Sequence, residues 1–236
     1  MLADFHNHSC LSPCGSLEMS PRTIARRAAQ AGVQIMALTD HNSARNTPAF
    51  AEACRAEGII PLAGLEITTI EECHVLAIFD TPKTALKMGK WVWRHLPRYP
   101  LDTEYYGDQP VVDTNENIVE LVDILLTSAI QKSFNDVQAE TSRLGGLFIP
   151  AHINRHSFSV ESQLGFLPRG TYDAIEVLRP QAAAYQKRYP DIPVITSSDA
   201  HVPAQIAQAS FELPIKDVSI PAIRKALQTR CKTAQA

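Results

Sequence analysis

Two histidines near the N-terminus, His6 and His8, are separated by one residue in the segment DFHNHSCLSPC. The apolar residues around them predict a short strand, on which positions i and i+2 point to the same face. Two imidazoles on one face can share a metal ion, and Cys14 adds a thiolate donor within reach of the same loop. An isolated pair of this kind also fits two polar residues at a strand end, so the rest of the chain must decide.

Further residues of metal-binding types lie in or next to the other short apolar segments of the chain. Six of the eight histidines lie in or directly after such a segment, whereas histidines placed at random would fall mostly in loops and on helix surfaces. The candidate ligands are His6, His8, Cys14, His41, Glu66, His74, His152, Asp199 and His201. Because nine ligands exceed what one four-coordinate ion needs, the sequence predicts two or three divalent ions of zinc, manganese or iron.

Apolar segments typical of buried strands alternate with helical patterns along most of the chain. Strands are expected at 33–41, 59–68, 74–80, 146–152, 172–178 and 193–201, with a last one at 209–214. Helices are expected at about 20–32, 47–57, 113–130, 133–144, 181–189 and 219–228, followed by a short tail from about residue 230. Residues 97–112 contain three prolines and three tyrosines, which predicts an inserted loop or lid after a helix that ends near His95.

Alternating strands and helices favour an α/β fold with parallel strands and right-handed crossovers. Polar residues at the strand ends favour a TIM-like barrel with its site at the C-terminal face of the strands. A doubly wound open sheet is the alternative, but no glycine-rich fingerprint follows the first strand. We therefore expect one barrel domain over residues 1–236, with an insertion at about 97–112.

Composition narrows the classes of partner. The formal charge of −3 and the pI near 6.2 give no electrostatic footprint for nucleic acid, so we expect no long nucleic-acid partner. The opening MLADFHNH has no basic and then apolar leader, and no apolar run is long enough for a membrane span, so we expect a cytoplasmic protein without a membrane partner. Five cysteines, an odd number, argue against a disulfide framework. The oligomeric state is left open.

The order of these motifs resembles the PHP superfamily, which includes histidinol-phosphate phosphatases and the PHP domains of bacterial DNA polymerases. The resemblance runs from residue 4 to about 203. It is carried by the motifs His6-Asn7-His8, Thr39-Asp40-His41, Gly64-Leu65-Glu66, His74, Pro150-Ala151-His152 and Ser198-Asp199-Ala200-His201. It implies a distorted (β/α)7 barrel and a trinuclear metal site for phosphoester hydrolysis.

The same resemblance implies a role for each ligand. His6, His8, Glu66 and Asp199 match the ligands of a first metal, and Glu66 bridges to a second metal that His74 and His152 complete. His41 and His201 match ligands of a third metal. Cys14 stands where many relatives carry Asp or His, and we expect it to bind the third metal as a thiolate.

Other polar residues near the ligands are candidates for binding or catalysis. Arg155, Arg45 and Arg179 could bind a phosphate through their planar guanidinium groups, although arginines near strand ends are also common on surfaces. His201 and His156 are candidates for donating a proton to the leaving group. Asp40 is a further catalytic candidate that could instead orient a neighbouring ligand.

These features together predict a metal-dependent phosphoesterase that attacks its substrate with a metal-bound hydroxide. The expected substrate is a small phosphorylated metabolite or a nucleotide. One alternative is an exonuclease that trims oligonucleotides, and another is a non-catalytic metal-binding module of the PHP type.

Overall fold

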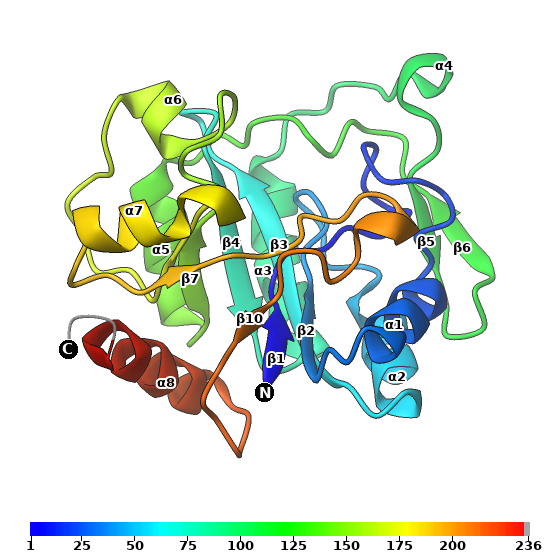
Figure 1. Cartoon of the computed structure of the whole chain (residues 1–236). Helices are drawn as coiled ribbons and strands as arrows, with labels where there is room; N and C mark the ends of the chain where they lie inside the picture. The colour runs from blue at the N-terminus through cyan, green and yellow to red at the C-terminus, as the bar shows by residue number, and fades with distance from the viewer. Residues whose placement is uncertain (234–236) are drawn as a thin grey trace.

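A six-stranded sheet crosses the molecule in the computed structural model, which describes residues 1–233 (Figure 1). The strand order is β10-β1-β2-β3-β4-β7. The strands are β1 (Leu2–Asp4), β2 (Ile35–Leu38), β3 (Ile60–Thr68), β4 (His74–Phe79), β7 (Leu147–Pro150) and β10 (Phe211–Glu212). Two small sheets accompany it, formed by β5 (Pro110–Val112) with β6 (Ile118–Leu121) and by β8 (Ile175–Glu176) with β9 (Val194–Ile195).

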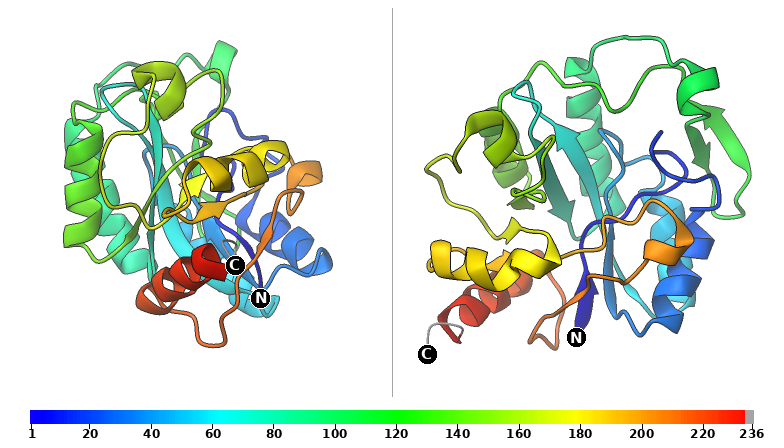
Figure 2. Two further views of the ribbon diagram at one scale, coloured as in Figure 1. Left: turned by 60° about the vertical axis from the view of Figure 1, so that its left-hand side comes forward. Right: turned by 45° about the horizontal axis from the view of Figure 1, so that its top comes forward.

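The helices surround this sheet, with α1 and α2 on one side and α8 near the N-terminal ends of the central strands (Figures 1 and 2). They are α1 (Pro21–Gln30), α2 (Thr47–Ala56), α3 (Pro82–His95), α4 (Thr103–Tyr106), α5 (Phe134–Arg143), α6 (Val160–Leu164), α7 (Ala182–Arg188) and α8 (Ile220–Thr233). In α1 and α3 a hydroxyl residue caps the first turn and proline follows it, because Ser20 and Thr81 accept backbone N–H bonds that the helix itself leaves unpaired. Within residues 1–233, no helix combines the length and the apolar character that a bilayer crossing requires.

Strand direction departs from the all-parallel arrangement expected from the sequence. β1, β2 and β3 are parallel, but β4 runs antiparallel to both β3 and β7, and β10 runs antiparallel to β1. Residues 69–73 link β3 to β4 directly, and so short a link cannot contain a crossover helix. As a result His74, at the start of β4, pairs with Thr68 at the end of β3 and lies at the edge where the parallel strands end.

The sheet curls into a half-barrel, and the described residues do not show the full (β/α)7 barrel that was expected. β8 and β9 contain two residues each and pair only with each other as a sheet. Directly after β9 the chain meets the segment that follows β1 through an isolated bridge between Asn7 and Ala200, and β10 then pairs with β1. Strands this short offer too few hydrogen-bonding groups to continue the ladder.

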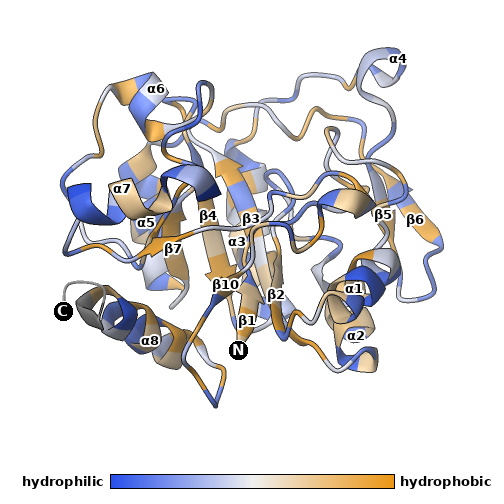
Figure 3. Ribbon diagram, in the orientation of Figure 1, coloured by the Kyte–Doolittle hydropathy of each residue, from blue (hydrophilic) through white to orange (hydrophobic). Residues whose placement is uncertain are grey.

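The core fills both faces of the central strands, as alternating side chains require. Leu65, Ile67 and Val75 pack toward α3 and α5, together with Met88 and Phe134. On the opposite face, residues of β2, β4 and β7 and Phe5, just after β1, pack against α8. They include Ile35, Leu76, Ile78 and Ile149, and α8 contributes Leu227. The strands are accordingly hydrophobic in Figure 3. Burial on both faces explains why their sequences are continuous apolar runs.

The helix expected at 113–130 is wrong, whereas the one expected at 133–144 is confirmed as α5. The Asp113 carboxylate accepts bonds from the backbone N–H groups of Asn115 and Asn117, at 2.8 and 2.9 Å, and this local turn competes with a helix. The turn joins β5 to β6, so the segment 97–112 contains α4 and β5 rather than only loop. The tail expected from about residue 230 begins inside α8, and residues 234–236 lie outside the described residues.

Two glycines offer a matched test of this packing. A Cβ on Gly64 of β3 would lie 2.8 Å from the Ala77 carbonyl oxygen, so Gly64→Ala should lower the free energy of unfolding by about 1–3 kcal/mol. A Cβ on Gly89 of α3 would meet nothing closer than 3.6 Å, so Gly89→Ala should raise it by about 0.5–1 kcal/mol through helix propensity. Urea unfolding followed by circular dichroism measures both, and equal stability of the two variants would contradict the packing described.

Candidate metal centre

The candidate ligands come together in one cluster at the edge where the parallel strands end. The chain delivers them from the ends of β1, β2 and β3, from the start of β4, and from the segments after β7 and β9. All the histidines of the cluster except His201 are buried, and so is Glu66. Ligand atoms lie within 4.8 Å of one another in three groups, which are His6/His8/Glu66/Asp199, His41/Glu66/His74 and His8/Cys14/His41/His201.

The Glu66 carboxylate lies at the centre of the cluster and is 1% exposed. Its Oε1 atom is 2.8 Å from Nδ1 of His74 and 3.0 Å from Nε2 of His152. Its Oε2 atom is 3.2 Å from Nδ1 of His41 and 3.3 Å from Nε2 of His8. One carboxylate therefore faces imidazoles on both of its oxygens, which is the geometry of a bridging ligand.

His6 and His8 have both rings turned to the same side, as the H-x-H spacing predicted, although β1 ends at Asp4 and both residues lie in the segment after it. Their Nε2 atoms are 3.2 Å apart, and both approach Oδ1 of Asp199, at 3.3 and 3.2 Å. Asp199 arrives from the other end of the chain, after β9, so only the tertiary fold brings it here.

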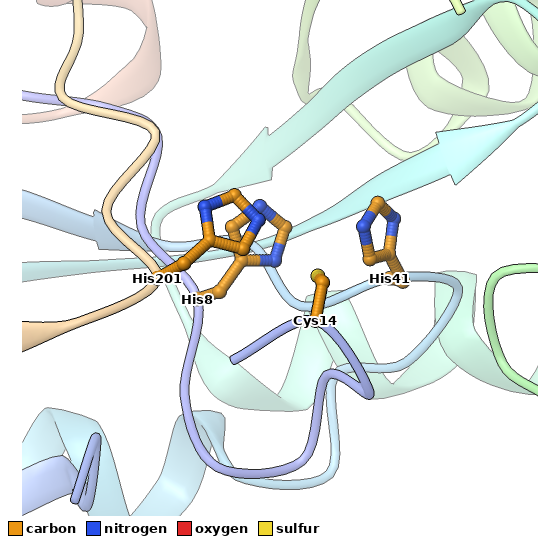
Figure 4. Close-up of side chains that lie close together, drawn as sticks. All are labelled: His8, Cys14, His41 and His201. Atoms are coloured by element: carbon orange, nitrogen blue, oxygen red, sulfur yellow. The ribbon is translucent and has the colours of Figure 1, made fainter. Parts of the chain in front are cut away.

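Cys14 lies beside the histidines on the loop that follows β1 (Figure 4). Its sulfur is within 4.8 Å of ligand atoms of His8, His41 and His201, although the residue as a whole is exposed. Figure 4 shows the thiol directed toward the imidazole rings and away from the helices below. The thiol is free, and a thiolate in this position would complete a set of nitrogen and sulfur donors.

A second layer of hydrogen bonds fixes the orientation of the rings. Nδ1 of His6 is 2.9 Å from Oε2 of Glu176, which also accepts the backbone N–H of His152 at 2.9 Å. Nδ1 of His8 is 3.0 Å from the Ser12 hydroxyl. With these Nδ1 atoms occupied, the Nε2 lone pairs of both rings point into the cluster, as metal ligation requires.

Glu176 is the functional residue that the sequence analysis missed. It stands in the apolar segment YDAIEVL and is 2% exposed. A carboxylate within such a segment is a signal in itself, because buried acidic residues are rare unless they are paired.

Asp40 holds the loop and does not reach the cluster directly, so its position corrects the catalytic role considered for it. Its carboxylate accepts the backbone N–H of Ser9 at 2.6 Å and the hydroxyls of Ser9 and Ser12 at 2.7 and 2.8 Å. Since the Ser12 hydroxyl donates to Asp40, its lone pair is left to accept from His8. Asp40 therefore positions His8 through Ser12.

The electrostatics of the cluster favour a bound cation. Burial lowers the pKa of His6, but the carboxylates of Glu176, Glu66 and Asp199 outweigh it and raise that pKa well above its usual value. Burial also lowers the pKa of His8, but its contacts with Asp199 and Glu66 outweigh burial and bring that pKa to about 9. Burial would raise the pKa of Glu66, but the surrounding histidines hold it well below its usual range. Ionised carboxylates buried at this density need positive charge between them, as protons or as metal ions.

Burial favours the neutral form of three other imidazoles of the cluster, those of His41, His74 and His201. Burial lowers the pKa of His41 well below its usual value, lowers that of His74, and brings that of His201 to about 4. Nδ1 of His41 is buried and forms no hydrogen bond among the described residues, although it lies 3.2 Å from Oε2 of Glu66. A buried polar atom of this kind is costly unless something binds it, so the residues present fit divalent metal ions.

The backbone around the cluster is strained at several points. His152, Asp199 and Asn42 have φ angles of 27°, 47° and 49°, and Phe158, whose ring stacks on His74 at 4.9 Å, has 56°. Side chains other than glycine are disfavoured in this region, and such residues concentrate at functional sites. The fold therefore tolerates disfavoured backbone conformations where they position the side chains of the cluster.

A cavity of about 530 Å³ opens beside the cluster, and its walls include His152, Asp199 and His201. Arg155 lies in this wall and its guanidinium is 3.0 Å from Oδ2 of Asp199. Arg179 lines the same cavity and donates to the Gln208 carbonyl at 2.6 Å. The cavity has the size of a site for a small ligand.

The remaining two sequence candidates differ in position. His156 is exposed on the loop that carries Arg155. Arg45 lies elsewhere, because it donates to Glu120, lies 4.7 Å from the centre of the Trp93 ring, and lines a separate cavity of about 300 Å³. Its place after His41 in the sequence did not bring it into the cavity beside the cluster, since the intervening loop turns toward α3.

Comparison with solved structures shows the same fold in several proteins. The lesion-specific endonuclease Q of Pyrococcus furiosus superposes with a TM-score of 0.68 at 19% identity, over 97% of this chain and 56% of its own. This chain thus spans only about half of that protein. A metal-dependent phosphoesterase, described as a putative one, from Bifidobacterium adolescentis has a TM-score of 0.59 at 19% identity, over 95% of both chains. An amidohydrolase from Chromobacterium violaceum has a TM-score of 0.56 at 17% identity, over 95% of this chain and 96% of its own.

Sequence comparison gives the family. No curated protein matches the chain. The family model of the PHP domain matches residues 4–144, more than half of the chain and the part that supplies His6, His8, Cys14, His41, Glu66 and His74. Members of this family are metal-dependent hydrolases of phosphoester bonds. The cluster, the fold and the family match agree, and the chain belongs to the PHP family.

Proposed function

We propose that this protein is a metal-dependent phosphoesterase that acts on a small phosphorylated metabolite or a nucleotide. The observation that carries the proposal is the convergence of nine metal-binding side chains beside a cavity of about 530 Å³ that contains Arg155. Two or three divalent ions of zinc, manganese or iron would match this set of nitrogen, oxygen and sulfur donors.

The donor groups divide naturally among three ions. His6, His8, Glu66 and Asp199 would hold the first, and Glu66 with His74 and His152 would hold the second. Cys14, His41 and His201 would hold the third, with the thiolate in place of a carboxylate or imidazole. Structural metal sites are closed by four ligands, so a cluster that shares ligands and opens on a cavity favours catalysis.

Bound divalent ions would supply Lewis acidity, which stabilises the negative charge of the phosphoryl oxygens and lowers the pKa of water. Arg155 would bind the phosphate, because it lines the cavity and donates to Asp199 through Nη1 alone. The other N–H groups of its guanidinium could then donate to the phosphate. Arg179 would contact more distant parts of the substrate from the same wall. His201, with its lowered pKa, suits a ligand, which leaves His156 as the candidate proton donor to the leaving group.

A nuclease is the second candidate function, and the fold of endonuclease Q favours it. One structure of that enzyme is described as a complex with a 27-mer duplex carrying an abasic lesion at the active site. A non-catalytic module is less well supported, because this chain keeps all nine donors in one cluster.

Turnover of three substrates separates these functions. We expect the metal-loaded protein to hydrolyse p-nitrophenyl phosphate faster than bis-p-nitrophenyl phosphate or short oligonucleotides, and to lose this activity with EDTA and in the His8→Ala variant. Faster cleavage of oligonucleotides would establish the nuclease instead. Full activity in chelator-treated protein would exclude the proposal, and metal binding without any turnover would leave the non-catalytic module.

Arg155→Ala should raise KM about 10–100-fold for a phosphomonoester, the loss expected for a hydrogen bond to a charged group, while kcat changes less. Metal content by elemental analysis should stay at the wild-type value, because Arg155 is not a metal-binding residue. Arg188→Ala is the control, since Arg188 pairs with Glu161 on the surface. An unchanged KM for Arg155→Ala would remove this residue from the substrate site.

Glu176→Gln should weaken metal binding about 10–100-fold, because the neutral amide polarises His6 less than a carboxylate does. Competition against a chromophoric chelator measures the affinity directly and does not need activity. Glu161→Gln serves as the control, since it also removes a partly buried, paired carboxylate but lies outside the cluster, beside Arg188 and Tyr185. Equal affinities for the two variants would show that Glu176 does not support the metal centre.

A further inference from the structure

Four basic residues lie along one face of α3. Lys83, Lys87, Lys90 and Arg94 follow one another at spacings of four, three and four residues, which places them on one side of the helix. All four are exposed, and the fourteen residues of α3 include no Asp or Glu. Eleven residues of helix place the first and last about 16 Å apart. We call these four residues the α3 ridge.

The charges of the α3 ridge are not neutralised locally. Within residues 1–233, none of the four forms an ion pair with a carboxylate. Glu140, which lines the same hollow as Lys87, Lys90 and Arg94, is bound by Arg143 through both oxygens at 2.7 Å. What distinguishes these four residues is their alignment on one helix face, because other exposed basic residues, such as Arg26, also have no ion-pair partner in the described part of the chain. The ridge is therefore a row of four exposed cations without ion-pair partners among the described residues, on a protein whose formal charge is −3.

The C-terminal end of the α3 ridge lies against the segment that follows the candidate ligand His41, in a cavity separate from the one beside the metal centre. α3 packs along β3 and β4, on the face of the sheet opposite α8 (Figure 2). The cavity of about 300 Å³ lies between Lys90, Trp93 and Arg94 of α3 and the segment 42–45. That segment directly follows the candidate ligand His41. Arg45 and Arg98 lie over the Trp93 ring, 4.7 and 4.3 Å from its centre. Arg98 adds a cationic group at this end, whereas Arg45 is paired with Glu120.

We propose that the α3 ridge binds the sugar–phosphate backbone of a nucleic acid. A row of unpaired cations about 16 Å long matches a row of phosphates better than it matches one small anion, because its charges do not converge on a point. A membrane surface is disfavoured, since none of the large exposed apolar side chains of the described residues lies on α3. The inference goes beyond the proposed function, because such binding does not require that the bound strand be hydrolysed.

The expectation of no long nucleic-acid partner rested on the net charge, and the α3 ridge removes that basis. A net charge adds all residues regardless of position, whereas a polyanion responds to charges within about a Debye length, roughly 8 Å at physiological salt.

Fluorescence anisotropy with a labelled DNA duplex of about 20 base pairs tests the proposal on the metal-loaded full chain over a range of sodium chloride concentrations, with gel electrophoresis to check that the duplex stays intact. The ridge variant carries Lys83→Gln, Lys87→Gln and Lys90→Gln. The control carries Arg26→Gln, Lys187→Gln and Lys225→Gln, three exposed residues on other helices, so both variants lose the same charge. A third variant with arginine at the three ridge positions keeps the charge.

We expect the ridge variant to bind more weakly and its slope of log K against log salt to fall in magnitude by about 3, roughly one for each lysine. The control and the arginine variant should bind like the wild type, and circular dichroism should show equal melting of all four proteins. Equal binding by the ridge and control variants would overturn the proposal. Binding of wild-type protein to phosphatidylserine vesicles but not to DNA would overturn it in favour of a membrane surface.

Discussion

The structure depends on one interaction, the burial of the Glu66 carboxylate among five imidazoles. An ionised carboxylate removed from water is costly unless cations or donors surround it, and here His6, His8, His41, His74 and His152 approach it at 2.8–3.3 Å. Those rings in turn are fixed from behind by Glu176 and by Ser12 with Asp40. The result is a set of lone pairs and negative oxygens directed at one small volume. Such an arrangement is satisfied by bound cations far better than by protein contacts alone.

The half-barrel brings these groups to a single edge of the sheet. Parallel strands β1, β2 and β3 deliver their C-terminal ends there, and β4 delivers its first residue because it runs the other way. The connections after β7 and β9 then place His152 and Asp199 in the disfavoured left-handed region of φ. Burial of the strands on both faces stabilises the fold and offsets the energetic cost of this strain.

Charge is distributed unevenly over the molecule, and the distribution bears on substrate choice. The cavity beside the cluster contains Arg155 and Arg179, which suits a compact phosphorylated compound. The flank formed by α3 is positive over a greater length and suits an extended polyanion. Under the two proposals made above, a phosphate group would bind at the metal centre and a longer chain of phosphates outside it. The net charge of −3 reflects neither surface.

The sequence by itself determined the nine metal-binding candidates, because metals require particular donor atoms and those residue types stand at the ends of apolar segments. It also determined most of the elements that carry them, since buried strands and capped helices leave local patterns. The direction of β4 and the hairpin in place of a helix after Asp113 depended on pairing and turn contacts that those patterns do not encode. Only the tertiary structure separated Arg155, which reaches Asp199, from Arg45, which pairs with Glu120, and only it placed Glu176 behind His6. The physical reason is that partners far apart in the chain are chosen by how the elements pack, and packing is a property of the whole fold.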